Sequence, residues 1–228
     1  MSSFVTSADF GEFEEEAGRM WANTYYFDDY REDSSDHIGY KPCKSPCTVE
    51  VAKTMIEHGI GIYDLVHKPR PNKLGRAVST VVKATFLKEL DLYKQADFSK
   101  INDELDPLYI VSFDVVSFNR NKYRKAWGLQ AYREDSEKSM GYKPMEFEVY
   151  ERLQEDLLTK GVGFYAAGYD AKPTKKADGT IESLLLLSKA ELVKSFDVFG
   201  WFNGQQEKKP VLVGTANGGK LVDEKKAA

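Results

Sequence analysis

Apolar residues recur at helical spacing in the stretch 47–58. Counting from Val49, they occupy positions i, i+3, i+6 and i+7, which places them on one face of a helix. Ser45 and Pro46 stand where an N-cap and a first-turn proline begin a helix, and Gly59 stands where a glycine ends one. The pattern predicts an amphipathic helix that ends at Gly59.

A similar pattern follows Pro144, where apolar residues such as Leu153 and Leu157 share a face and Gly161 closes the stretch. Length and apolar content favour further helices at about 8–29, 76–93, 119–132 and 180–202. The segment 108–118 is ambiguous, either a strand or the end of a buried helix. These patterns predict an all-α protein.

The two patterned stretches belong to an internal repeat. Residues 30–63 and 132–165 align without a gap over 34 positions with 12 identities, at a constant offset of 102. The identities form blocks, Tyr-Arg-Glu-Asp-Ser, then Gly-Tyr-Lys-Pro, then Gly-x-Gly-x-Tyr. A fixed repeat indicates duplication of one structural unit. We therefore expect two pseudo-equivalent helical units packed as one body, 1–107 and 108–203, followed by an extended C-terminal arm, 204–228.

Composition and charge fit an ordinary soluble protein. The chain is 42% hydrophobic with a net charge of −4, and residues 1–36 alone carry ten acids against two arginines. This modest acidity argues against nucleic acid as a partner, because general nucleic-acid binding needs many cations on one face. No apolar run approaches the ~20 residues of a membrane span, and the first residues lack the features of a signal peptide. A soluble, cytoplasmic location is expected.

Catalytic and metal-binding patterns are not evident. The glycine pairs at 59–61 and 161–163 follow helical stretches, whereas a dinucleotide site needs them after a strand and before a helix. His37 and His58 with Cys43 and Cys47 could form a zinc set, but the second copy has serine and lysine at the two histidine positions. No nucleophilic triad is recognisable. We expect a protein that is not an enzyme, with no catalytic and no metal-ligating residues.

Cys43 and Cys47 allow two interpretations. Their counterparts in the second copy are Met145 and Val149, which favours buried apolar positions, since free cysteine behaves as a small hydrophobe. Alternatively, the pair is specific to the first copy and attaches an electrophilic prosthetic group.

The duplication, the uneven charge, the aromatic content of 13% and the expected arm indicate a non-catalytic scaffold or linker within an assembly of other protein subunits. This layout resembles the γ-type linkers of phycobilisome rods, which are associated with phycoerythrin. The resemblance implies a light-harvesting antenna linker at the plastid stroma or thylakoid surface, with a bilin attached covalently to Cys43, Cys47 or both. Two alternatives stay open: a small-molecule-binding protein or enzyme with a pocket between the repeats, and a viral structural subunit.

Overall fold

The protein is mostly β. The computed structural model describes residues 2–206 except 32, 73, 120 and 176–180. Strands make up 62% of the structure, and the described part of the chain holds only 3 short α-helices. The prediction of an all-α fold is therefore wrong.

Eleven strands and three α-helices follow one another along the part of the chain that the structure describes. The strands of the first half are β1 (Ser2–Phe13), β2 (Glu16–Arg31), β3 (His37–Pro46), β4 (Gly61–Pro71) and β5 (Ala77–Glu89). Those of the second half are β6 (Asp106–Phe118), β7 (Asn121–Gln130), β8 (Ser139–Gly141), β9 (Met145–Val149), β10 (Gly163–Lys175) and β11 (Ile181–Ser195). The helices are α1 (Val49–His58), α2 (Gln154–Lys160) and α3 (Val198–Gln206), with 3-10 turns η1 (Leu92–Gln95) and η2 (Glu151–Leu153).

Five strands of the second half form a closed barrel. Around the ring the order is β6, β7, β9, β11 and β10, and β10 pairs again with β6. Neighbouring strands in this ring pair antiparallel, except β9 and β11, which pair in parallel. We call it the C-terminal barrel.

The first half repeats this order as β1, β2, β3, β5 and β4. Here the parallel closure between the third and fifth strands is a single bridge, Cys47 to Val81. Thr48 N donates to Val81 O at 3.2 Å, and Tyr150 N donates to Leu187 O at 3.2 Å at the equivalent place in the C-terminal barrel. We call this ring the N-terminal barrel.

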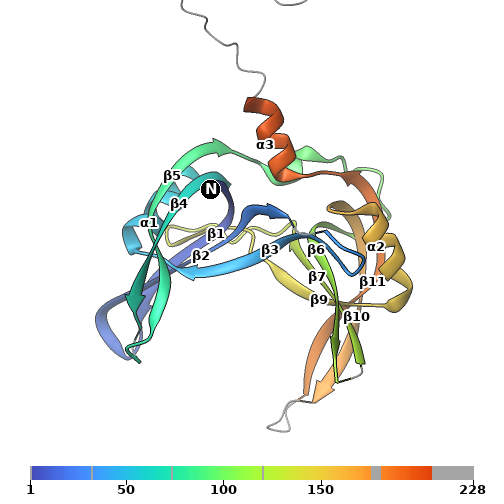
Figure 1. Cartoon of the computed structure of the whole chain (residues 1–228), viewed down its shortest axis with the longest axis horizontal. Coiled ribbons are helices and arrows are strands. Elements are labelled where there is room, and N and C mark those ends of the chain that lie inside the picture. Colours follow the sequence, from blue (N-terminus) through green and yellow to red (C-terminus); the bar gives the residue numbers. More distant parts are fainter. Residues whose placement is uncertain (1, 32, 73, 120, 176–180, 207–228) are drawn as a thin grey trace, which may run out of the picture.

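The barrels are joined by exchanged strands (Figure 1). The start of β3 leaves the N-terminal barrel and pairs with β6, so that Gly39 lies opposite Ser112. Reciprocally, β8 pairs with β1, with Gly141 opposite Ser7. Each barrel thus extends a sheet of the other, and the 11 strands form one connected sheet.

The two repeat copies fold alike in detail. Asp33 and Asp135 each bind the preceding arginine and accept a hydrogen bond from a glycine N–H, at 2.9 Å from Gly39 and 2.8 Å from Gly141. Both glycines have φ near +90°, a conformation that residues with a Cβ rarely adopt. The identical residues of the repeat therefore build the corner from which each exchanged strand departs.

Helix prediction succeeded only between the third and fourth strands of each unit. In the second unit it succeeded only in part, because the first residues of the helix expected after Pro144 form the strand β9 and α2 begins at Gln154. Thr48, rather than Ser45, is the N-cap of α1, and Gly59 and Gly161 end α1 and α2. The helices expected at 8–29, 76–93 and 119–132 are wrong, because these segments are the strands β1 and β2, β5 with the following turn, and β7. The helix expected at 180–202 is β11 followed by the start of α3, and the ambiguous 108–118 belongs to β6.

The pattern of burial explains why these segments are strands and not helices. Strands of a small barrel alternate between core and solvent, and β-branched residues such as those of β5 fit this pleated surface. Short apolar runs match helical and strand spacing almost equally well, and only ring closure decides between them.

Asp197, just before α3, links the second unit to the first. Asp197 caps α3 by accepting from Phe199 N and Gly200 N at 3.0 Å each. The same carboxylate accepts from Tyr40 Oη at 2.7 Å and pairs with Arg31, both in the first unit. Residues 204–206 of the expected extended arm are the end of α3, and the rest of that arm, 207–228, lies outside the described residues.

Candidate functional site

Strand β2 presents an aromatic face to the outside of the N-terminal barrel. Ala22, Thr24 and Tyr26 are buried, because they point into the barrel. The alternate residues therefore point outwards, and Trp21 and Tyr25 among them are half-buried.

Strand β7 repeats this face 102 positions later. Trp127 corresponds to Tyr25 and Tyr123 to Trp21 in the sequence, and the strand pairing agrees. Tyr25 lies opposite Ser7 on β1, and Trp127 lies opposite Ser112 on β6. Tyr123 is 38% exposed. Each barrel therefore carries two outward aromatic rings at equivalent positions, which we call the aromatic pairs.

The ring of Trp21 lies over Gly11, its partner across the β1–β2 hairpin. A Cβ on Gly11 would come within 2.8 Å of Trp21 Cζ2, so only glycine lets the indole lie flat against the sheet. A flat indole offers its opposite face to a ligand.

Cations accompany both aromatic pairs. Lys44 Nζ lies 5.1 Å from the centroid of the Tyr25 ring, within cation–π range. Lys125, on the same face of β7 as Trp127, pairs with Glu146 of β9 at 2.6 Å. The first pair thus has an ammonium over one of its rings, and the second has a lysine–glutamate ion pair beside it.

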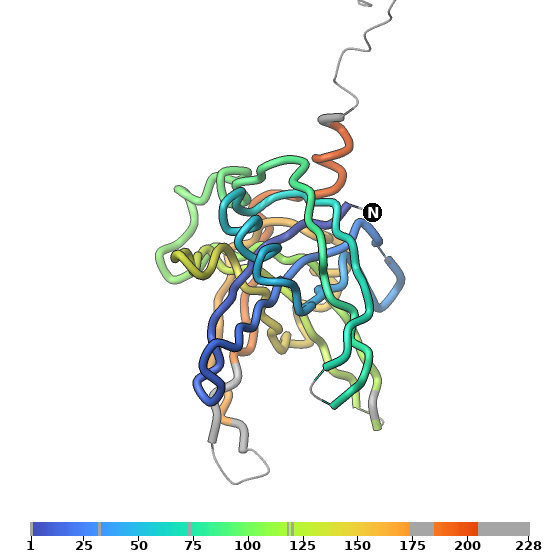
Figure 2. Tube along the Cα trace, turned by 90° about the vertical axis from the view of Figure 1, so that its left-hand side faces the viewer, coloured from blue at the N-terminus to red at the C-terminus, as the bar shows by residue number. Residues whose placement is uncertain are grey.

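The β-hairpins of both barrels project to the same side of the molecule (Figures 1 and 2). In Figure 2 the β4–β5 hairpin lies on the same side as the β6–β7 hairpin, and the β1–β2 hairpin lies opposite them. The sequence 67–76, from the end of β4 to the start of β5, carries four cations and no acid, whereas 12–16 in the β1–β2 hairpin carries four acids. The β4–β5 hairpin is therefore basic, although the whole chain is acidic.

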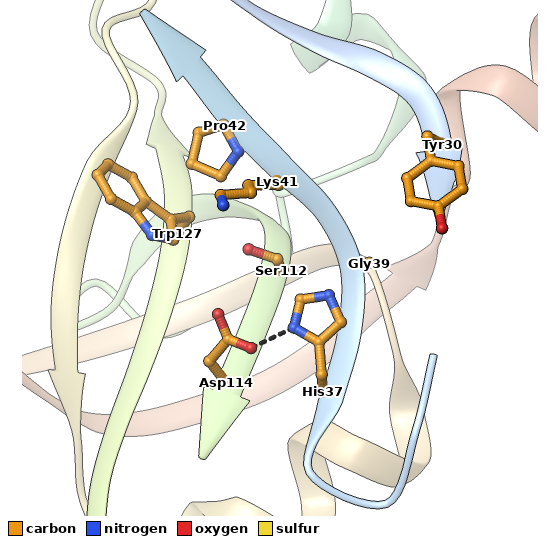
Figure 3. Close-up of a pocket in the computed structure, with 8 residues that line it drawn as sticks. All are labelled: Tyr30, His37, Gly39, Lys41, Pro42, Ser112, Asp114 and Trp127. Atoms are coloured by element: carbon orange, nitrogen blue, oxygen red, sulfur yellow. Dashed lines mark hydrogen bonds and ion pairs between the residues drawn. The ribbon is translucent and has the colours of Figure 1, made fainter. Parts of the chain in front are cut away.

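A pocket of about 470 Å³ lies where β3, β6 and β7 meet (Figure 3). Trp127 forms one wall, and Lys41, His37 and Asp114 face the same space. His37 Nδ1 is in hydrogen-bond contact with Asp114 Oδ1, because the two residues pair across β3 and β6. We call this space the junction pocket, since strands from both repeat units line it.

The equivalent place on the N-terminal barrel is bridged by ion pairs. Lys143, the counterpart of Lys41, lies 2.5 Å from Glu134 and 3.6 Å from Asp9, the counterpart of Asp114. The hydrogen bond with Glu134 raises the pKa of Lys143, so the ammonium stays charged. The two otherwise equivalent surfaces therefore differ in their polar groups.

The cysteines singled out in the sequence lie on and just beyond β3, apart from the junction pocket. Cys43 is half-buried, and burial raises the pKa of its thiol. Cys47 is buried in the core of the N-terminal barrel, and burial raises its pKa to about 12. Attachment of a bilin stays a prediction, and the helical layout on which the linker resemblance rested is not found.

The histidines do not gather. His37 lies in the junction pocket, His58 stacks on Phe86, and His67 lies beside Tyr26. Within the ranges that the structure describes, no group of three or more His, Cys, Asp or Glu side chains is placed to hold a metal ion. None of the helices in those ranges has the length and apolar character of a membrane crossing.

No protein-family model matches the sequence, and no curated protein is significantly similar to it.

Sequence analysis did not single out the aromatic pairs or the junction pocket. Two signals were available for the pairs: aromatic residues at positions 21 and 25, which share one face of a strand, and aromatic residues again at 123 and 127, 102 positions later. The pocket had no such signal, because β3 and β6 meet only in the tertiary structure.

Proposed function

We propose that this protein binds single-stranded nucleic acid across the outer faces of both barrels. The observation that carries the proposal is the equivalence of the aromatic pairs, Trp21 with Tyr25 and Tyr123 with Trp127, each on the outward face of the second strand of its barrel. A fold that needed aromatics only for its core would not place them outside in both copies.

Unpaired bases stack on such rings. Each base–aromatic contact contributes ~1–3 kcal/mol, and it tolerates any sequence because every base has a flat face. Cations beside the rings attract the phosphates, as Lys44 can do here. This chemistry needs local cations rather than a basic chain, so the net charge of −4, from which we had expected no nucleic-acid binding, does not oppose it.

The arrangement of each barrel resembles the OB-fold. Each barrel, like the OB-fold, has five strands, and its third and fifth strands in chain order are in parallel contact. A helix lies between the third and fourth strands; β8 is not counted, because it pairs with the other barrel. OB-folds bind oligonucleotides or oligosaccharides on the face of strands 2 and 3, between the β1–β2 and β4–β5 loops. A fold alone does not establish function, so the resemblance only supports the argument from the aromatic pairs.

The hairpins suggest the path of the strand. Hairpins of both barrels project on the side of the molecule seen at the bottom of Figures 1 and 2, and the basic β4–β5 hairpin lies across from the acidic β1–β2 hairpin. A single strand running along the long axis between the hairpins would meet both barrels in turn. Electrostatic repulsion from the acidic β1–β2 hairpin would keep phosphates near the β4–β5 hairpin.

The test is binding of fluorescent oligodeoxythymidine of about 30 nucleotides, long enough for two OB-type sites of ~4–16 nucleotides each. We expect affinity that falls with rising salt, and a loss of about 5- to 150-fold in Trp127→Ala, the range that one stacked base supplies. Duplex of the same length should bind more weakly, because its bases are already stacked. The same binding measurement with an oligoribonucleotide shows whether RNA is bound as well.

Tyr132→Ala is the matched control. Tyr132 is 73% exposed and follows the end of β7 that is remote from the β6–β7 hairpin, so its removal should leave affinity unchanged. Equal losses in Trp127→Ala and Tyr132→Ala, or no binding by the unaltered protein, would refute the proposal.

A protein scaffold is the second candidate. Leu74, Val66 and Leu87 are 76%, 44% and 43% exposed on or beside the β4–β5 hairpin, and exposed apolar side chains of this kind anchor partner proteins. Absence of oligonucleotide binding, together with a stable complex with another protein that Leu74→Ser disrupts, would favour it.

A further inference from the structure

We propose that the junction pocket holds one base of the bound strand and prefers a base that carries an exocyclic amino group. This inference rests on the proposed function and assigns a base-reading role to one place on that surface. The occupant is a nucleobase of single-stranded DNA or RNA, namely adenine, cytosine or guanine rather than thymine or uracil.

The pocket has the size and walls that such a base needs. Its volume of about 470 Å³ falls in the ~300–1,000 Å³ range of small-molecule sites. Trp127 supplies a flat wall, and the polar groups lie beside it rather than on it. A base stacked on the indole would therefore turn an edge toward β3 and β6.

Asp114 is the group that can read this edge. Its Oδ1 is in contact with His37, and no hydrogen bond to its Oδ2 is found within the described ranges. A carboxylate oxygen accepts hydrogen bonds and cannot donate one, so it selects an edge that donates an N–H. Exocyclic amino groups donate in this way, as cytosine N4 does to acidic side chains. Thymine and uracil carry carbonyl oxygens at those positions, and their one ring donor, N3–H, lies between two carbonyl oxygens that repel a carboxylate.

Rigidity makes the carboxylate selective. Asp114 lies within β6 and is oriented by the imidazole of His37, its cross-strand neighbour. Gly39 of β3 lets the two strands approach closely, because a Cβ there would lie 2.0 Å from Val111 O of β6. The close pairing of β3 and β6 thus fixes the position of the acceptor.

The N-terminal barrel lacks this reading group. At the equivalent place Lys143 lies 3.6 Å from the carboxylate of Asp9, and the position of His37 is taken by Ser139. Tyr25 can still stack a base there, but the carboxylate of Asp9 lies within reach of the Lys143 ammonium and has no imidazole beside it to orient it. The N-terminal barrel would then bind any base, and the C-terminal barrel would favour bases that carry an amino group.

The experiment compares oligodeoxythymidine of about 30 nucleotides with the same oligomer carrying one central deoxycytidine. The protein can slide to place that cytosine in the pocket, so we expect tighter binding by about three- to tenfold, the contribution of one hydrogen bond. Asp114→Asn should bind both oligomers equally, because an amide can present a donor or an acceptor. Asp9→Asn, at the equivalent place, should retain the preference, and a thermal melt of each variant verifies folding.

The outcomes separate the two proposals. Tight binding of oligodeoxythymidine with no preference for the cytosine oligomer would overturn the pocket inference and leave the proposed function standing. A preference that survives in a folded Asp114→Asn variant would also overturn it. Binding of neither oligomer would refute the proposed function and the pocket inference together.

Discussion

Replacing Gly39 by alanine tests the exchange of strands between the barrels. Gly39 lies in β3 opposite Ser112 of β6, with φ at +90°. A Cβ at this position would lie 2.0 Å from Val111 O and 3.0 Å from Ser112 Cα, both backbone atoms of β6. Backbone cannot rotate away as a side chain can, so β3 and β6 would have to separate.

The expected cost has two parts. Left-handed backbone in a residue with a Cβ costs roughly 1–2 kcal/mol. Separation of β3 from β6 also breaks the strand pairing next to the buried Ile38 and Phe113, which belong to the core of the C-terminal barrel. Together we expect a loss of about 4 kcal/mol or more, large against a typical total stability of ~5–15 kcal/mol.

Gly59→Ala is the matched control, because Gly59 has φ at +83° and nothing within 4 Å of its would-be Cβ. It carries the backbone strain without the steric clash, so its loss should be roughly 1–2 kcal/mol. Gly141→Ala, where a Cβ would lie 2.0 Å from Thr6 O, should match Gly39→Ala.

Urea unfolding followed by tryptophan fluorescence provides the measurement, with the midpoints and slopes of the four proteins compared. Equal losses in Gly39→Ala and Gly59→Ala would mean that β3 and β6 do not approach as described. That result would refute the reasoning on the exchanged strands and on the junction pocket.

Three further predictions concern stability and thiol chemistry. Tyr63→Phe and Tyr165→Phe should each cost about 0.5–1.5 kcal/mol in urea unfolding, because each hydroxyl donates to a helix-end carbonyl at 2.6 Å, and unequal losses would contradict the equivalence of the copies. Burial by itself would raise the pKa of Asp33, but hydrogen bonds from its arginine and a glycine N–H lower it below 3.8; stability should therefore fall as pH drops below about 4, and Asp33→Asn should flatten that slope. In the native protein an alkylating reagent should modify Cys43 slowly and leave Cys47 unmodified, as intact mass would reveal, whereas rapid labelling of Cys47 would contradict its burial.

Local rules determined the parts of this protein that the sequence predicted well. The repeat was visible because the same corner, from arginine and aspartate to a positive-φ glycine, is built twice with the same residues. The helix ends at Gly59 and Gly161 were visible because a left-handed residue at that position favours glycine in any fold.

Tertiary structure alone decided whether the remaining apolar runs become strands or helices. In β11, for example, Leu187 and Ala190 are buried while Lys189 is exposed, a pattern that follows from closing a ring with β9 and β10. Pairing partners lie far apart in the chain, so no window of sequence contains the information.

The candidate site was hidden for the same reason. From the sequence alone, Trp127 is expected to be a core residue. It lines a pocket only because β3 crosses from one barrel to the other and brings His37 beside Asp114. Short-range chemistry thus fixed the repeated corners and helix ends, whereas the closure of two barrels and the exchange of strands between them decided which side chains face the solvent together.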